Sequence, residues 1–268
     1  MPRIVHISDS HLGPTPEYQV MGQTPYQTAI ELVKELASLP FDYEAVVHTG
    51  DISADKSKSS YELASKLYSK LPVPCLFVAG NHDDSEMMRS MLPVPGAQFQ
   101  NAEPHRLSYA VQIGKIRYLI LDAQPEPALD PQGLVPNSQI SFLRAEAKFS
   151  GSDVVVLMHY PPFPIGSPWF DKNMTMINGE LLHAVLKEFG PKLRAVLFGH
   201  MHGAMTIVRD GLPYIGVPSG AARFRFWPQD IQPFIAHPIK ASFNIISFDH
   251  DRVTTTQYLA GLDWNSIG

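Results

Sequence analysis

Aspartate, asparagine and histidine side chains recur at short spacings in this chain, in five groups suited to metal chemistry. The groups are Asp9-Ser10-His11, Gly50-Asp51, Gly80-Asn81-His82-Asp83, His159 and Gly199-His200-Met201-His202. Carboxylate, amide and imidazole ligands suit divalent Mn, Fe or Zn, and the set holds no soft sulfur ligand. It offers more groups than one four-coordinate ion needs. A pair of ions bridged by one carboxylate fits it better.

Each group lies at the end of an apolar, β-branched run that we predict to be a strand, or directly follows it. These runs cover residues 4–8, 44–49, 75–79, 153–159 and 194–200, and a further one covers 117–122. Several lack strict alternation, as is typical of strands covered on both faces. In open α/β sheets, binding crevices lie at the carboxyl ends of the strands. Residues far apart in the sequence are therefore expected to gather at one edge.

Taken one at a time, these residues have simpler structural roles. Asp9, Asp51 and Asn81 suit turns or helix caps, and a lone buried His159 is more often hydrogen-bonded in a core than bound to metal. Their shared position after strands, in this order, favours metal binding for the set. The glycines before three of the groups let the backbone turn sharply there.

Three other residues of chemical interest lie inside predicted elements. His6 and His48 fall within strand-like runs, where we expect them to be packed or to support the ligands. Cys75, the only cysteine, is expected to be a small core residue. Alone, it excludes an internal disulfide and a cysteine-rich zinc site.

Helix-like segments alternate with the strand-like runs, which predicts an α/β layered fold with much parallel pairing. These segments cover residues 24–39, 57–71, 137–149 and 178–189. The first opens with Thr24 as a cap and Pro25 at the first helical position. With no repeat or linker in the sequence, we expect a single domain over residues 1–268.

The last third of the chain changes character. Residues 203–217 are predicted to form a hairpin around Asp210-Gly211, and 241–249 and 252–260 a second antiparallel pair. The segment between them, 219–240, has no clear period and is predicted to be a long loop.

The loop at 219–240 is rich in arginine and aromatic residues. Arg223 and Arg225 suit contact with phosphate, and a neighbouring aromatic ring suits stacking on a base. Arg223 is therefore our candidate for substrate binding from this loop. The alternative, that the loop packs on its own domain or on a partner subunit, stays open.

The net charge and the distribution of apolar residues limit the kinds of partner that the chain is expected to bind. The chain has 268 residues and a net charge of −5, without long runs of one sign. This argues against a nucleic-acid polymer bound through a broad basic surface. The N-terminus lacks the layout of a signal peptide, and no apolar run approaches membrane-spanning length. We expect a soluble cytoplasmic protein that does not use a membrane.

The five groups, in this order, resemble the motifs of the calcineurin-like metallophosphoesterases. The resemblance runs from residue 9 to residue 202. It implies a four-layer α/β/β/α sandwich, with two mixed sheets flanked by helices, and a dinuclear metal centre. By motif, one ion is held by Asp9, His11 and His202, the other by Asn81, His159 and His200, and Asp51 bridges them.

The same resemblance implies roles around the metals. His82 is the histidine near the ions that is not a ligand, and we expect it to be the general acid or a stabiliser of the leaving group. Asn81 and His82 are also expected to contact the substrate. Asp83 orients His82 or a neighbouring ligand, or else caps the helix that follows it. Hydrolysis by a metal-bridging hydroxide, without a covalent enzyme intermediate, is the implied reaction.

The details of the motifs favour small phosphodiesters. The Gly80–Asp83 group and the segment 158–164 are most similar to class III cyclic nucleotide phosphodiesterases and bacterial glycerophosphodiesterases. No arginine occurs in residues 50–56, where the phosphoprotein phosphatases of this superfamily grip a monoester. The expected substrate is a 3′,5′-cyclic nucleotide such as cAMP, or a glycerophosphodiester.

Other functions remain open at this point. A phosphomonoesterase or nuclease of the same superfamily is one alternative, and a metal-binding scaffold without catalysis is another. The resemblance also implies a homo-oligomer, a dimer or larger, with residues 219–240 as a candidate contact.

The resemblance makes one geometric prediction. In extended backbone, the side chains of residues at positions i and i+2, such as His200 and His202, point the same way. The family assignment sends these two to different ions. The backbone is therefore expected to leave strand geometry by Gly199.

Overall fold

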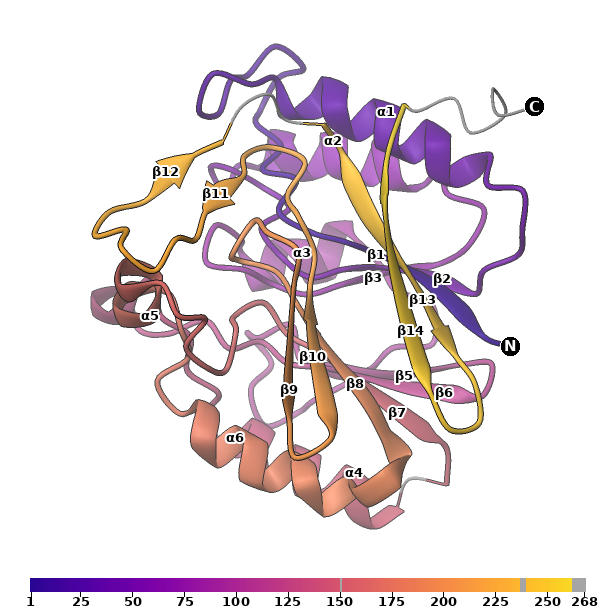
Figure 1. Ribbon diagram of the computed structural model, residues 1–268. Helices are drawn as coiled ribbons and strands as arrows, with labels where there is room; N and C mark the ends of the chain where they lie inside the picture. The colour runs from indigo at the N-terminus through magenta and orange to yellow at the C-terminus, as the bar shows by residue number, and fades with distance from the viewer. Residues whose placement is uncertain (150, 237–239, 262–268) are drawn as a thin grey trace, which may run out of the picture.

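Two mixed β-sheets face each other at the centre of the fold (Figure 1). The computed structural model describes residues 1–149, 151–236 and 240–261. The first sheet has the order β14 (Val253–Leu259), β13 (Ser242–Phe248), β1 (Arg3–Ile7), β2 (Ala45–His48) and β3 (Cys75–Phe77). The second has the order β4 (Gln98–Phe99), β5 (Tyr109–Ile113), β6 (Ile116–Ile120), β7 (Asp153–Leu157), β8 (Leu193–Phe198), β10 (Leu212–Gly216) and β9 (Met205–Arg209).

The parallel strands are neighbours in each sheet: they form the middle of the second sheet and one side of the first. β1, β2 and β3 run parallel, as do β6, β7, β8 and β10. The flanking strands β13, β14, β4, β5 and β9 pair antiparallel. The carboxyl ends of the parallel strands of each sheet therefore lie at one edge.

Helices cover the outer face of each sheet (Figure 1). α1 (Pro25–Ala37) and α2 (Lys58–Tyr68) lie over the first sheet, and α4 (Asn137–Phe149) and α6 (Gly179–Leu186) over the second. The layers are therefore α/β/β/α, which confirms the predicted fold. Shorter helices, α3 (Ser85–Met91), α5 (Pro168–Asn173), η1 (Pro127–Leu129) and η2 (Lys187–Lys192), lie in the connections.

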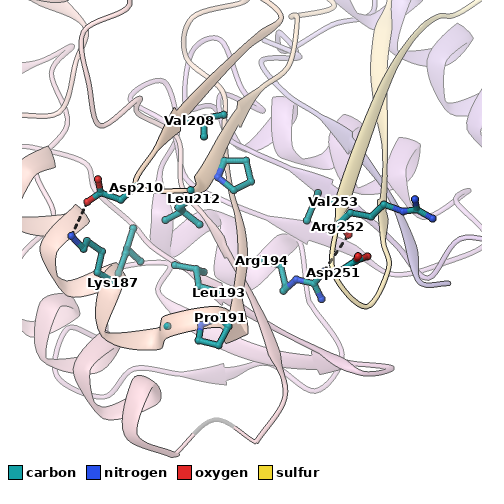
Figure 2. A pocket seen from close by; sticks show the side chains of 14 residues that line it. Lys187, Pro191, Leu193, Arg194, Val208, Asp210, Leu212, Asp251, Arg252 and Val253 are labelled. Carbon is teal, nitrogen blue, oxygen red and sulfur yellow. Dashed lines mark hydrogen bonds and ion pairs between the residues drawn. The ribbon is translucent and has the colours of Figure 1, made fainter.

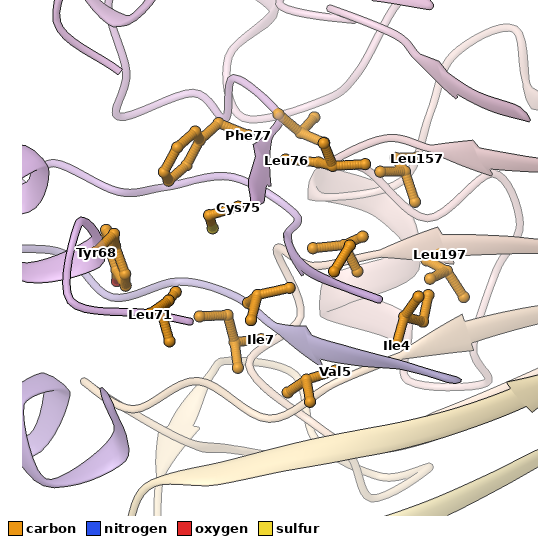
Figure 3. Close-up of a cluster of buried hydrophobic side chains, with 14 of the residues drawn as sticks. Ile4, Val5, Ile7, Tyr68, Leu71, Cys75, Leu76, Phe77, Leu157 and Leu197 are labelled. Carbon is orange, nitrogen blue, oxygen red and sulfur yellow. The ribbon is translucent and has the colours of Figure 1, made fainter. Parts of the chain in front are cut away.

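The side chains of β7 show why the central strands lack a polar face. Val155 and Leu157 belong to the apolar cluster between the sheets, whereas Val154 and Val156 belong to the cluster under α4 and α6. All four are completely buried. Figure 3 shows Leu157 and Leu197 of the second sheet near Ile4 of the first. Apolar and polar residues alternate along a strand where one face of the sheet is exposed to solvent, and both faces of these strands are buried.

The predicted elements are present, with shifts of a few residues at their ends. Pro25 stands at the first helical position of α1, but the side chain of Thr24 makes no capping hydrogen bond. The hairpin at 203–217 is β9–β10, with Asp210 and Gly211 at positive φ. Cys75 is buried in the core, where burial raises the pKa of its thiol.

Two predictions about connections were incomplete. The segment 219–240 is not wholly irregular, because β11 (Phe224–Arg225) and β12 (Phe234–Ile235) form a small antiparallel ribbon. Its residues 237–239 lie outside the described residues. The helix expected after Asp83 is α3, whereas the strands β4 and β5 and the helix α5 were not predicted.

In the described ranges, no helix combines the length and the apolarity that crossing a bilayer requires.

Candidate metal centre

The predicted ligands gather into two buried clusters of donor atoms. Asp9, His11, Asp51 and His202 form the first, and Asp51, His159 and His200 form the second; in each, the donor atoms lie within 4.8 Å of one another. All six residues are at most 5% exposed. The side chains come from residues that follow β1, β2, β7 and β8, so the carboxyl ends of strands in both sheets meet here.

Asp51 is common to both clusters. Its Oδ2 atom lies 3.3 Å from Nε2 of His159 and 3.7 Å from Nε2 of His11. Its Oδ1 atom accepts the backbone N–H of His82 at 2.8 Å. One carboxylate therefore faces both groups of imidazoles, which is the position that a bridging ligand requires.

The backbone at this edge is held in an unusual conformation. Left-handed φ angles of 43° to 66° occur at five of the cluster residues: Asp9, His11, Asp51, His200 and His202. Non-glycine residues seldom adopt this region, and such strain persists only where the surroundings enforce it. The concentration of strained positions at one site is typical of a functional site.

The two histidines of the Gly199–Gly203 segment separate as predicted. β8 ends at Phe198, His200 joins the second cluster and His202 the first. The backbone N–H of His200 donates to both carboxylate oxygens of Asp9 at 3.1 Å, which fixes this turn against the end of β1.

Backbone carbonyls fix the orientation of three imidazoles. Nδ1 of His159 faces the carbonyl of Thr49 at 2.7 Å, and Nδ1 of His202 faces that of Ala222 at 3.1 Å. Nε2 of His200 faces the carbonyl of Pro131 at 2.9 Å. Because a carbonyl only accepts, these nitrogens carry the ring protons. The opposite nitrogen of each ring is directed into the clusters, as in histidines that bind metal.

Burial and mutual attraction set the charges of the cluster. Burial lowers the pKa of His11 and of His200 to about 3. Burial also lowers the pKa of His159, but attraction to Asp51 outweighs it and raises the pKa to about 9. For Asp51, burial favours the neutral acid, yet attraction to His159 holds the pKa well below its usual range. The carboxylates stay ionised and so remain able to bind cations.

The clusters fit a pair of divalent ions on grounds that do not depend on motif. Oδ1 of Asn81 is buried without a hydrogen-bond partner, and a buried polar atom of that kind is costly unless something binds it. A metal ion would satisfy this oxygen and the inward nitrogens together. The donor types suit Mn, Fe or Zn. The individual ligand roles stay predictions.

His82 lies on the solvent side of the clusters. Its side chain is exposed, and its ring centroid is 5.0 Å from that of His11 in an edge-on arrangement. It belongs to neither cluster. This is the placement expected of a residue that meets the leaving group rather than a metal.

Asp83 holds two loops of the site together. Its carboxylate accepts the backbone N–H groups of Ile52, Ser53 and Gly80 at 3.0–3.2 Å. It also accepts the hydroxyl of Tyr61 at 3.2 Å. Burial, and then repulsion from Asp51, raises its pKa to about 6. The alternative role as a helix cap is wrong, because the cap of α3 is Asp84, which accepts the N–H of Met87.

The loop at 219–240 packs on its own chain. The guanidinium of Arg223 donates to the carbonyl of Lys240 and to the hydroxyl of Ser242. Phe224 stacks on His202 with ring centroids 4.8 Å apart. The substrate role of Arg223 and the role of this loop in an oligomer both stay predictions.

A hollow of about 610 Å³ lies at the end of β8 that is remote from the metal ligands (Figure 2). Leu193 at the start of β8 lines it, whereas His200 follows the end of the strand. Most of its charged groups already have partners: Lys187 pairs with Asp210, Arg194 with Asp153, and Arg252 with Asp249. Size alone does not make it the active site.

Sequence reasoning missed several of the groups that support the ligands. The carbonyls of Thr49, Pro131 and Ala222 leave no signal in a sequence, because every residue has a carbonyl. Gln124 was missed too. Its amide donates to the carbonyls of Gly80 and Asp83, which braces the loop that carries Asn81.

Some known proteins are similar to this chain in sequence, and others in fold. A 3′,5′-cyclic adenosine monophosphate phosphodiesterase, CpdA of Vibrio vulnificus, is 26% identical over 224 residues, covering 83% of this chain and 78% of that protein. The glycerophosphodiester phosphodiesterase GpdQ of Enterobacter lignolyticus is 27% identical over 238 residues, covering 86% and 82%. A dimetal phosphatase from Danio rerio has the same fold, with a TM-score of 0.70 at 15% identity over 98% of this chain and 97% of that chain.

Residues 2–204, which include all five motif groups, match the family described as calcineurin-like phosphoesterase. The chain belongs to the calcineurin-like phosphoesterases.

Proposed function

We propose that this chain hydrolyses small phosphodiesters with two divalent metal ions held at the paired clusters. The observation that carries the proposal is the position of Asp51, whose carboxylate faces His11 in one cluster and His159 in the other. A carboxylate shared in this way serves two ions a short distance apart, which suits in-line displacement at phosphorus.

The residues present divide between the two ions. Asp9, His11 and His202 would hold one, and Asn81, His159 and His200 the other, with Asp51 binding both. When bound, such ions lower the pKa of a water molecule towards neutrality and offset the charge of the phosphoryl group.

The residues of the chain supply the other requirements of the reaction. His82, exposed at the rim, donates the proton that the leaving alkoxide needs. Asn81 presents its amide beside His82 and so contacts the phosphoryl group. Asp83 positions both of them through the backbone of the loop from Gly80 onward.

Two observations support a diester over a monoester. The segment after Asp51 offers one exposed cation, Lys56, and no arginine. A dianionic monoester gains more from a bidentate arginine than a diester does, since a diester carries one charge less. The relatives from Vibrio vulnificus and Enterobacter lignolyticus are a cyclic AMP phosphodiesterase and a glycerophosphodiester phosphodiesterase, and both of these activities are diester hydrolyses.

The test is reconstitution of metal-depleted protein with Mn²⁺, Fe²⁺ or Zn²⁺. Turnover is measured on bis(p-nitrophenyl) phosphate, cyclic AMP, a glycerophosphodiester and p-nitrophenyl phosphate. The proposal expects metal-dependent diester turnover that exceeds monoester turnover. Absence of diester turnover with every metal would overturn it, and a preference for the monoester would identify a phosphomonoesterase instead.

A further inference from the structure

A small hollow of about 170 Å³ adjoins the second cluster. It is lined by Lys56, Asn81, Gln124, Pro125, Pro127 and Asp130. Asn81, which lines the hollow, is itself one of the predicted metal ligands. On its other side, Asp130 precedes Pro131, whose carbonyl contacts the ring of His200. A group bound in this hollow would therefore lie directly beside the reacting phosphorus.

The hollow carries one cation and one anion that are free to meet a ligand. Lys56 and Asp130 are both exposed. Within the part of the chain that the structure describes, no ion pair involves either of them. Lys56 is held at a φ of 59°, a conformation that lysine seldom adopts, by the bond from its backbone N–H to Oγ of Ser53 at 2.8 Å. The backbone position of Lys56 is thus fixed by the loop that follows Asp51, and its side chain is free to reach a ligand.

The opposite wall is rigid. Gln124 donates to the carbonyls of Gly80 and Asp83, so it joins this wall to the Asn81 loop. Pro125 and Pro127 have their φ angles restricted by their rings. This wall therefore keeps its shape, while the exposed side chains of Lys56 and Asp130 are free to adjust to a ligand.

The volume of the hollow decides what it admits. Sites that enclose drug-sized ligands are commonly about 300–1,000 Å³, so 170 Å³ suits a small alcohol better than a nucleoside. A base would also need an aromatic face to stack on, and none of the residues that line the hollow is aromatic.

We infer that this hollow, lined by Lys56, Gln124 and Asp130, binds a small hydroxylated alcohol group of the substrate. Lys56 contacts a non-bridging phosphate oxygen, and the carboxylate of Asp130 accepts a hydroxyl of the alcohol. Gln124 holds the wall opposite Lys56 in place through its hydrogen bonds to the carbonyls of Gly80 and Asp83. This inference rests on the proposed function and names the substrate class within it: diesters of small polyols are preferred to cyclic nucleotides.

Lys56→Gln and Asp130→Ala test the inference on the metal-loaded protein. Asp130→Ala is expected to raise the KM for glycerophosphoethanolamine at least fivefold more than the KM for bis(p-nitrophenyl) phosphate, which has no hydroxyl group. Lys56→Gln should raise the KM for both substrates, because both carry non-bridging phosphate oxygens. The matched controls are Lys58→Gln, which removes only an exposed ion pair with Glu62, and Glu126→Gln in the exposed wall segment. The controls should leave both constants within twofold of the starting values.

A binding measurement separates this inference from catalysis. With Zn²⁺-loaded protein, the amide resonances of Lys56 and Gln124 should shift on titration with glycerol 3-phosphate and shift less with adenosine 5′-monophosphate. Equal effects of Asp130→Ala on both diesters, no effect of Lys56→Gln on either, or stronger shifts with the nucleotide overturn the inference while diester turnover itself persists. Loss of all diester turnover in the unmodified protein would instead overturn the proposed function.

Discussion

The Nε2 atom of His159 and the Nδ1 atom of His200 lie 3.0 Å apart, and the other nitrogen of each ring already faces a backbone carbonyl. The carbonyls fix the ring protons on those outer nitrogens. The two facing nitrogens then both carry lone pairs when the rings are neutral. Lone pairs at this distance repel unless a proton or a metal ion lies between them. The pair is therefore arranged for a cation.

Metal binding should release a proton from this pair. Burial lowers the pKa of His159, but attraction to Asp51 raises it to about 9, so the metal-free chain keeps a proton there at neutral pH. A metal ion binds only the neutral ring. We expect about one proton to be released per chain at pH 7, and metal affinity to fall as the pH is lowered.

Calorimetry of Zn²⁺ binding in two buffers of different ionisation enthalpy measures this proton. A heat of binding that does not depend on the buffer would contradict the protonated state assigned to His159.

His82→Ala should separate metal binding from turnover. The side chain is exposed and belongs to neither cluster, so metal content should stay the same. Loss of a general acid costs on the order of 10²- to 10⁴-fold in kcat. The loss should be larger for a glycerophosphodiester, whose leaving alkoxide needs a proton, than for bis(p-nitrophenyl) phosphate. His105→Ala, at an exposed position on a connection, is the control. Equal losses on the two substrates would exclude the acid role.

Asp83→Asn should loosen the loops that carry Asp51 and Asn81. The carboxylate accepts N–H groups from Ile52, Ser53 and Gly80. The side-chain NH2 group of asparagine would face some of these N–H groups, and two donors cannot form a hydrogen bond with each other. An unsatisfied buried group costs about 1–3 kcal/mol. Urea unfolding should show a loss of this order, together with weaker metal binding. Asp84→Asn, which keeps a capping side chain at α3, should change stability little. Unchanged metal affinity in Asp83→Asn would limit Asp83 to a role in stability.

Acid should destabilise the metal-free chain through its buried histidines. Burial lowers the pKa of His6 to about 3 and of His48 to about 4, against about 6.5 in an unfolded chain. The unfolded state therefore binds protons first, and the free energy of unfolding falls as the pH drops from about 6.5 towards 4.

The variant His6→Gln tests this origin of the acid sensitivity. It removes one titrating ring and leaves an amide that can reach Thr49, the partner of His6 at 2.9 Å. Urea unfolding at pH 7.5 and pH 5 should show a smaller difference between the two pH values for this variant than for the unmodified chain. The exposed His105→Gln should leave the difference unchanged. The same pH dependence in His6→Gln would assign the acid sensitivity to other groups.

The sequence predicted the strand ends well because their chemistry is local. Asp9, Asp51 and His200 each follow an apolar run within three residues, and parallel strands bring such ends to one edge. Cys75 and the hairpin at Asp210-Gly211 were predictable for the same reason, since a few neighbouring residues define them.

The supporting contacts were not predictable from the sequence. The carbonyl of Pro131 orients His200 from a loop 69 residues away, and nothing in its residue type marks it. α5 has 6 residues and β11 has 2, which are too short for a period to be read. Lys56 and Asp130 meet at the hollow only through the tertiary fold. Long-range geometry, rather than residue type, decides these features.

The central claim is that Asp51 joins two metal sites into one catalytic centre. The most direct measurement is a titration of metal-depleted protein with Mn²⁺, following bound metal and turnover of bis(p-nitrophenyl) phosphate together. The account predicts two equivalents per chain, with turnover rising as the second equivalent binds. It also predicts that Asp51→Asn loses both binding and turnover, while the exposed Asp42→Asn keeps them. Full diester turnover at one equivalent or without metal, or an Asp51→Asn variant that binds two ions and turns over normally, would contradict it.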